Sequence, residues 1–223
     1  MSGLAVAIVS GGMDSVALAY DLASQHYDLH LVTFDYGQRH RKEIGYAVRC
    51  AGQLGARHTV VDLTSMAPLL KGSALTDDIE VPEGHYAAPN MAATVVPNRN
   101  AVMLAIAYAG AVAEGAAIVA AGMHAGDHPI YPDCRPEFIK AFASMEVVAT
   151  EGHAPPNLEL YTPWLNVTKG DIVKRGEGLG VPWAETWSCY KGLDLHCGEC
   201  GTCYERKEAF EEAVVADPTE YMK

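Results

Sequence analysis

A glycine-rich hexapeptide at residues 10–15, with the sequence Ser-Gly-Gly-Met-Asp-Ser, constrains the fold of this chain more than any other feature. An apolar run at residues 4–9 precedes it, and helical spacing of apolar residues follows over residues 14–25. Glycines let several backbone N–H groups point into one concavity, and the N-terminus of the following helix adds partial positive charge. The segment therefore predicts a loop that binds phosphate or pyrophosphate, with the Ser10 and Ser15 hydroxyls as further donors.

Two related loop types do not fit this segment. No Gly-Lys pair occurs anywhere in the sequence, which excludes a Walker A loop, and the glycines do not follow the dinucleotide-binding pattern. A second glycine-rich stretch at residues 176–180 is interpreted as a helix end followed by a turn. Asp14 is not suited to direct phosphate contact, so it indicates either a nearby Mg²⁺ or a cap on the helix.

Apolar strands and helical segments alternate along the first half of the chain. We expect strands at residues 4–9, 29–34, 58–61 and 117–121, and helices at residues 14–25, 40–54 and 99–114. This order predicts an α/β fold with a doubly wound parallel sheet. Residues 64–96 show little periodicity, which is typical of a lid, a binding loop or a disordered segment. The longest apolar run, at residues 101–113, is shorter than the ~20 residues that a membrane span needs.

Helix signals continue towards the C-terminus. Pro136 suits the first position of a helix, Thr168 and Asp171 form a capping-box pattern, and residues 205–216 predict a closing helix. We expect an α/β domain over residues 1–165 and a C-terminal helical segment over residues 166–223.

Four cysteines close to the C-terminus have metal-ligand spacing. Cys189, Cys197, Cys200 and Cys203 form a C-x7-C-x2-C-x2-C pattern, and four thiolates can complete a closed tetrahedral zinc site. We expect one structural Zn²⁺ per chain. An iron–sulfur cluster is the main alternative, because C-x2-C-x2-C also occurs in ferredoxins, and an unmetallated cluster is the third. Cys50 is expected to be a small buried residue of a helix.

The loop after the fourth expected strand is dense in polar groups. Ligands of open parallel sheets bind at the carboxyl ends of the strands, so this loop is a candidate substrate site. Asp133 can accept from the adjacent N–H donors of a guanine-like edge, Tyr131 can stack or donate its hydroxyl, and Arg135 can hold a carboxylate. Taken alone, the same residues also fit an ordinary loop with an Asp turn.

A neighbouring cluster contains His124, Asp127 and His128. Their spacing would place them on one helix face, but Gly126 and Pro129 argue against a helix and hence against a transition-metal site. We expect a role in handling ATP, Mg²⁺ or ammonia, with Asp127 as the strongest candidate. A hydrogen-bonded loop is the alternative.

The charge balance limits the partners of the chain. The formal net charge of -12 repels phosphate backbones at long range, so we expect no nucleic-acid partner. The N-terminus has neither a basic region nor a small-residue cleavage site. We therefore expect a cytoplasmic protein with no membrane partner.

Five motifs together carry a family resemblance. The hexapeptide resembles the pyrophosphate loop of the N-type ATP pyrophosphatases. Together with Phe-Asp-Tyr-Gly-Gln-Arg-His at residues 34–40, Pro-Asn-Arg-Asn at 97–100, Tyr-Pro-Asp-Cys-Arg at 131–135 and the four cysteines, it resembles the 7-cyano-7-deazaguanine synthase family over nearly the whole chain. The resemblance implies an adenine nucleotide alpha hydrolase-like fold and an ATP pyrophosphatase domain over residues 1–165. It also implies ATP and Mg²⁺ as cofactors, 7-carboxy-7-deazaguanine and ammonia as substrates, and a homodimer.

The resemblance also assigns residues. It implies that Asp14, Ser15, Arg99 and Asp127 are catalytic, and that residues 36–39 lie near the adenosine, although these four residues also fit a plain turn. The family usually has Pro-Gly-Arg-Asn where this chain has Asn98, and Asn tolerates a left-handed backbone well. The residues implied to bind ATP are Val9, Ser10, Gly11, Gly12, Met13, Asp14, Ser15, Val16, Ala17, Leu18, Arg99 and Asn100.

The implied reaction has two activations. ATP adenylates the acid, ammonia gives an amide, and a second activation removes water to give the nitrile. Positioning and charge stabilisation suffice, so Cys134 is not proposed as a nucleophile. Three alternatives remain at this point: an enzyme that stops at the amide, a tRNA-modifying enzyme of the same superfamily, and a nucleotide-binding module without catalysis.

Overall fold

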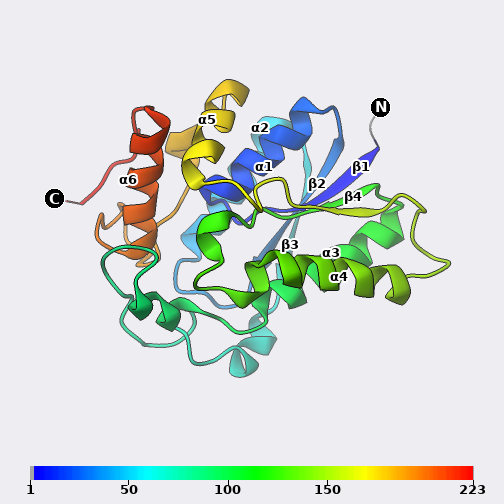
Figure 1. The fold of residues 1–223 in the computed structure, drawn as a ribbon, viewed down its shortest axis with the longest axis horizontal. Helices are drawn as coiled ribbons and strands as arrows, with labels where there is room; N and C mark the ends of the chain where they lie inside the picture. Colours follow the sequence, from blue (N-terminus) through cyan, green and yellow to red (C-terminus); the bar gives the residue numbers. More distant parts are fainter. Residues whose placement is uncertain (1–2, 223) are drawn as a thin grey trace.

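The structure is a computed structural model that describes residues 3–222. Its centre is a five-stranded parallel sheet with the strand order β3-β2-β1-β4-β5, which confirms the doubly wound α/β fold (Figure 1). The strands are β1 Leu4–Ile8, β2 Asp28–Asp35, β3 Arg57–Asp62, β4 Ile118–Ala120 and β5 Glu159–Tyr161. The strand order reverses between β1 and β4, and such a switch point leaves a crevice at the carboxyl ends of the strands.

Helices cover both faces of the sheet (Figure 1). The helices are α1 Met13–Ser24, α2 Lys42–Leu54, α3 Arg99–Glu114, α4 Pro136–Ala149, α5 Lys169–Leu179 and α6 Gly201–Ala213. Alternate residues of β1 point to opposite faces, as the two-residue period of a strand requires. Ala5 and Ala7 enter the core under α1, α2 and α5, whereas Val6 enters the core under α3 and α4.

Local signals fix several element ends as expected. α3 spans Arg99–Glu114, the range read from the sequence. At the start of α5, Thr168 Oγ1 accepts from the Asp171 amide at 3.1 Å, and Asp171 Oδ2 accepts from the Thr168 amide at 3.2 Å. Gly180 ends α5 with a left-handed φ of 74°. These caps depend on residues three to five positions apart, so a sequence pattern is sufficient to find them.

Two elements differ from the sequence expectation. β5 was not expected, because its three residues do not form an apolar run: Glu159 is exposed, and Leu160 and Tyr161 are only partly buried. α6 begins at Gly201 and ends at Ala213, whereas the expected range was 205–216. Its first turn overlaps the cysteine segment, and Val214 ends it with a left-handed φ of 57°.

The irregular segment over residues 64–96 is a folded wrap. It contains two 3₁₀ turns, Thr64–Leu69 and Pro89–Thr94, and buries Leu75 completely. The Gly84 amide donates to the Glu199 carbonyl at 3.0 Å, which fastens the segment to the cysteine-rich stretch. In Figure 1 this segment lies beneath α6.

The C-terminal segment shares the main core. The Trp183 and Phe210 rings pack edge to face, with their centroids 5.7 Å apart. Both residues belong to one buried cluster with Leu18 and Leu22 of α1. Arg175 of α5 pairs with the buried Asp21 of α1 at 2.8 Å. The boundary near residue 165 therefore divides the sequence without dividing the core. No described helix is long and apolar enough to cross a membrane.

Because the core is shared, the chain is expected to unfold in one transition. Phe210→Ala removes a fully buried ring and should lower the free energy of unfolding by about 3–5 kcal/mol. Urea unfolding followed by circular dichroism and by tryptophan fluorescence tests this, since all three tryptophans lie between residues 164 and 187. Glu211→Ala, at an exposed position of α6, is the matched control. Fluorescence that changes before the circular dichroism would identify an independent C-terminal unit.

Candidate active site and metal centre

A cavity of about 240 Å³ opens at the carboxyl ends of β1, β2 and β4. The hexapeptide loop forms one wall, the start of α3 a second, and the wrap and the cysteine-rich segment the others. Among the sequence-predicted residues, the cavity is lined by Val9, Ser10, Gly12, Met13, Asp14, Ser15, Arg99, Asn100, Asp127 and Tyr131. Residues from distant parts of the sequence therefore meet at the switch point of the sheet.

The hexapeptide loop leaves a helix N-terminus free for an anion. Gly12 is the N-cap of α1 and no side chain caps the helix, so the first amides of α1 have no partner within the helix. The Ser15 hydroxyl donates to the Gly12 carbonyl at 3.0 Å, and the Gly12 amide donates to Ser10 Oγ at 3.2 Å. These bonds fix the curl of the loop. The loop thus has the geometry of a phosphate site, and Asp14 is not a helix cap.

Only glycine fits at position 11. Gly11 has a φ of +96°, and a Cβ there would lie 2.2 Å from the Glu43 carbonyl oxygen of α2. The Gly11 carbonyl accepts from the Trp187 amide at 2.9 Å. Gly11 thus joins the loop to α2 and to the C-terminal segment, although it does not line the cavity itself.

A buried cation lies beside the loop. Lys169 Nζ is 3.3 Å from Asp14 Oδ2 and 2.5 Å from Glu205 Oε2, and the Lys169 side chain is 13% exposed. Burial lowers the pKa of Lys169, but the carboxylates of Asp14, Glu205 and Asp127 outweigh this effect and raise the pKa above its usual value. Lys169 is therefore a permanent positive charge on the cavity wall.

Asp14 has the features of a hard-cation ligand. Its Oδ1 atom is buried and has no hydrogen-bond partner among the described residues. A buried unpaired carboxylate oxygen is costly unless something binds it, and Mg²⁺ prefers carboxylate oxygens. The donor set at Asp14 thus fits Mg²⁺.

The opposite wall is aromatic and carries a second cation. Arg99 Nη1 donates to the Tyr36 hydroxyl at 2.9 Å. Tyr86 is buried and Tyr190 is partly buried, and desolvation is the largest effect that raises the pKa of each, so both hydroxyls stay neutral. Tyr131 completes the wall, and its hydroxyl forms a hydrogen bond with Thr94 Oγ1 at 2.7 Å. The wall therefore offers a fixed guanidinium next to flat surfaces that suit a planar ring.

Several predicted residues lie elsewhere. Val16, Ala17 and Leu18 are fully buried in the core under α1 and do not line the cavity. Asn98 has the left-handed φ of 63° that was expected of it, and starts α3. Asn100 lines the cavity and holds the neighbouring turn by donating from Nδ2 to Cys134 Sγ at 3.2 Å.

Two of the three predicted substrate residues do not line the cavity. Asp133 Oδ2 accepts from the Asn100 amide at 2.9 Å, so its carboxylate satisfies the N-terminus of α3. Arg135 is exposed, and its Nε donates to the His128 carbonyl at 2.8 Å. Around the 3₁₀ turn at Pro132–Cys134, Tyr131 and Cys134 line the cavity, whereas Asp133 and Arg135 do not.

The histidine cluster is a network of hydrogen bonds. His124 Nδ1 accepts from the Gly126 amide at 3.1 Å, and Asp127 Oδ2 accepts from the His124 amide at 3.1 Å. Asp127 Oδ1 accepts from the Tyr86 hydroxyl at 3.0 Å. Asp127 therefore lines the cavity with both oxygens engaged.

Sequence reasoning missed Lys169, Glu205, Glu43 and Tyr190. One signal was present, because Lys169 occupies the first turn of α5, where the helix dipole disfavours a cation. Such a residue is explained by a partner from elsewhere, here Glu205 of α6. Glu43 and Tyr190 show no comparable signal, because only the fold brings them to the cavity.

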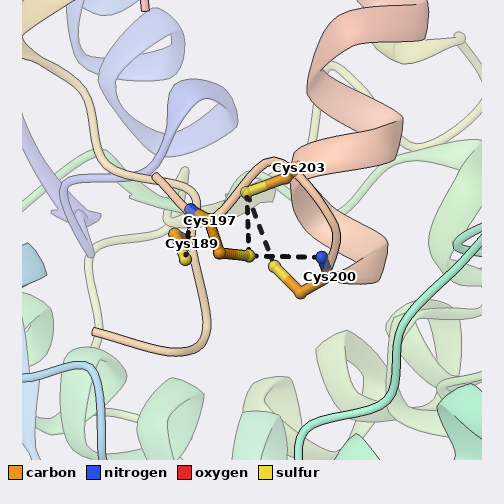
Figure 2. A group of neighbouring side chains, drawn as sticks. All are labelled: Cys189, Cys197, Cys200 and Cys203. Atoms are coloured by element: carbon orange, nitrogen blue, oxygen red, sulfur yellow. Dashed lines mark hydrogen bonds between the residues drawn. The ribbon is translucent and has the colours of Figure 1, made fainter. Parts of the chain in front are cut away.

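The four cysteines form the second centre (Figure 2). All are buried, and their sulfur atoms lie within 4.8 Å of one another. Cys200 Sγ is 3.5 Å and Cys197 Sγ is 3.9 Å from Cys203 Sγ, close to the roughly 3.8 Å edge of a tetrahedron with 2.3 Å zinc–sulfur bonds. The amides of Glu199 and Cys200 donate to Cys197 Sγ, as suits a thiolate. The cluster is thus able to bind a metal ion.

The metal centre and the cavity share a wall. Ser188, Tyr190 and Thr202 lie next to or between the cysteine ligands and line the cavity. A metal ion that orders the cysteine segment therefore also orders part of the cavity.

Comparisons with known proteins agree with this geometry. Residues 4–214 match the family model of the queuosine biosynthesis protein QueC. The chain is 57% identical over 216 residues to the 7-cyano-7-deazaguanine synthase of Sinorhizobium fredii, covering 97% of this chain and 91% of that protein. It is 55% identical to the enzyme of the same name from Ruegeria pomeroyi, and the match covers 96% of this chain and 92% of that protein.

Solved structures support the fold. The U34-tRNA thiolase NcsA from Methanococcus maripaludis, solved with its [4Fe-4S] cluster, superposes with a TM-score of 0.50 at 13% identity. The match covers 95% of this chain and 68% of that one. At this identity the likeness concerns the fold alone.

The metal centre predicts a sharp loss of metal on ligand removal. Protein purified without added metal should contain about one equivalent of metal per chain, measured by inductively coupled plasma mass spectrometry. The Cys203→Ser variant should contain almost none. The variant should also melt at a lower temperature, since metal binding contributes to folding. Cys50→Ser, which changes a buried cysteine of α2, should keep the metal. A Cys203→Ser protein that retains a full equivalent would refute the assignment.

Proposed function

The chain belongs to the family of the queuosine biosynthesis protein QueC, and from this premise we propose that it is a 7-cyano-7-deazaguanine synthase, an ATP-dependent carbon–nitrogen ligase. Its substrates are then 7-carboxy-7-deazaguanine, ATP and ammonia. One observation carries the proposal beyond the family match: a single cavity has a phosphate loop on one wall and Arg99 with four tyrosines on another. Such a cavity can bring a nucleotide and a planar acid together.

The loop wall is proposed to bind the phosphates of ATP. The free amides at the start of α1 would hold the pyrophosphate portion, and the hydroxyls of Ser10 and Ser15 would order the loop around it. Lys169 would neutralise charge that develops on the phosphates. When bound at Asp14, Mg²⁺ would supply further charge neutralisation.

The first chemical step is proposed to be adenylation. A carboxylate is a poor electrophile, so an oxygen of the acid attacks the α-phosphorus of ATP and pyrophosphate leaves. The acid and the nucleotide are both anions, and Arg99 and Lys169 lower their repulsion as they approach. No covalent enzyme intermediate is required. Burial raises the pKa of the Cys134 thiol far above its usual range, so Cys134 is not a nucleophile at neutral pH.

Two further steps lead to the nitrile. The nitrogen of ammonia attacks the acyl carbon, AMP leaves with the acyl oxygen retained on phosphate, and one proton is lost to give the amide. The amide oxygen then attacks the α-phosphorus of a second ATP, and pyrophosphate leaves. Loss of AMP and two protons gives the nitrile. We propose that Asp127, on the cavity wall next to the buried His124, receives such protons, because a carboxylate oxygen that accepts one hydrogen bond keeps a second lone pair.

The metal is proposed to be a structural Zn²⁺, one per chain. In an iron–sulfur cluster the thiolates bind different iron atoms, so they lie further apart than four thiolates that share one ion. The close sulfur contacts therefore favour a single ion with four ligands. A colourless protein that contains zinc is expected, whereas a brown protein would indicate a cluster. We also propose a cytoplasmic homodimer with no nucleic-acid partner, in keeping with the net charge.

Product analysis tests the proposed activity. The purified protein with 7-carboxy-7-deazaguanine, ATP, Mg²⁺ and ammonium should yield the nitrile and AMP by mass spectrometry. If the amide persists as the product, the substrate assignment stands, but the enzyme performs only the first of the two activations. Unchanged acid without AMP would overturn the proposal and favour a tRNA-modifying enzyme.

Lys169 is expected to contribute to the adenylation step and not to the later attack by ammonia. Lys169→Met removes a buried cation from the phosphate wall and should lower kcat/KM for acid-dependent ATP–pyrophosphate exchange by about 100-fold or more. Lys174→Met, at an exposed position of the same helix, is the matched control and should leave the exchange unchanged. Circular dichroism establishes that the variant is folded. Normal exchange in a folded Lys169→Met protein would place the lysine outside the phosphate site.

A further inference from the structure

We propose that Glu43 of α2, oriented by His40 and Gln38, selects the substrate ring by accepting hydrogen bonds from the N1–H and 2-amino groups of its guanine-like edge. This inference rests on the proposed function and names the residue that gives the same cavity its specificity.

Three carboxylates line the cavity, and two of them are committed. Asp14 faces Lys169 beside the phosphate loop, at 3.3 Å. Asp127 accepts from Tyr86 through Oδ1 and from the His124 amide through Oδ2. Glu43 is the remaining carboxylate among the lining residues. Asp133, the acceptor expected from the sequence, is held on the N-terminus of α3.

Glu43 has one fixed oxygen and one available oxygen. Oε1 accepts from Gln38 Nε2 at 3.2 Å and lies 3.4 Å from His40 Nε2. No described residue bonds to Oε2. The Glu43 side chain is only 13% exposed, and no Lys or Arg of residues 3–222 pairs with it. A nearly buried carboxylate without a cation is costly, and paired N–H donors from a ligand would remove that cost.

His40 independently indicates that a polar ligand binds here. The side chain is 5% exposed and lines the cavity, and its buried Nδ1 atom has no hydrogen-bond partner in the described part of the chain. Buried polar atoms are nearly always paired, so an unpaired one on a cavity wall marks a contact that a ligand completes. Because His40 also contacts Glu43, the two groups form one recognition edge.

The charges on the cavity wall match the two ends of the proposed substrate. The Tyr36 hydroxyl accepts from Arg99, and both Arg99 and Glu43 act electrostatically on Tyr36. No ion pair joins Arg99 to Glu43 among the described residues. In 7-carboxy-7-deazaguanine, the carboxylate is on the five-membered ring and the N1 and 2-amino donors are on the opposite edge. Arg99 would therefore take the carboxylate, Glu43 the donors, and the tyrosines the ring faces.

Ring selectivity tests this assignment. Glu43→Gln replaces one acceptor oxygen with an NH₂ donor, which suits a 2-oxo ring and opposes a 2-amino ring. The assay is acid-dependent AMP formation with 7-carboxy-7-deazaguanine and with 7-carboxy-7-deazaxanthine. The wild type should prefer 7-carboxy-7-deazaguanine. In Glu43→Gln, the ratio of the kcat/KM values for the two compounds should shift towards 7-carboxy-7-deazaxanthine by at least about 100-fold. The KM for ATP should not change.

Controls separate this inference from the proposed function. Glu80→Gln, at an exposed position of the wrap, should leave the ratio unchanged. Equal losses on both acids, or a change confined to the KM for ATP, would overturn the role of Glu43. If wild-type protein forms AMP from neither acid, the proposed function itself fails. If Glu43→Gln does not fold, calorimetry on the wild type remains: it should bind 7-deazaguanine at least about 10-fold more tightly than 7-deazaxanthine, and equal affinity would refute the inference.

Discussion

The packing of Gly11 against α2 is the constraint on which the site depends. With its positive φ and no room for a side chain, Gly11 brings the phosphate loop against the Glu43 backbone and binds Trp187 of the C-terminal segment. A single backbone position thus joins three walls of the cavity. Any residue with a Cβ would have to separate them, because the nearest atoms are backbone and cannot rotate away.

Charge at the site opposes charge on the whole chain. The net charge of -12 would repel two anionic substrates, yet Arg99 and Lys169 lie in the cavity wall. Low exposure strengthens the field of each cation locally, whereas the surface carboxylates are screened by solvent and salt. Two cations on the cavity wall of a negatively charged chain therefore agree with a small-molecule substrate.

Local patterns were predictable from the sequence, and long-range placement was not. The phosphate loop, the bounds of α3, the Thr168 capping box and the cysteine cluster each depend on residues close together in sequence, and all are present. Asp133 and Arg135 have suitable chemistry, but one 3₁₀ turn decides where they point. Glu43 reaches the cavity because α2 packs on Gly11, and no short sequence pattern encodes that contact.

The cysteine centre explains how a loop-rich wall becomes rigid enough for selection. Ser188 and Tyr190 come from a segment with little regular structure, where backbone freedom would normally allow a binding site to change shape. A metal ion bound by the four cysteines would fix both ends of this segment, and the buried Arg206 donates hydrogen bonds to Thr186 Oγ1 and to the Trp183 carbonyl beneath it. The part of the cavity wall that Ser188 and Tyr190 form is thus supported from beneath. Discrimination between two ring edges requires that support, because a site that could shift would adapt to either edge.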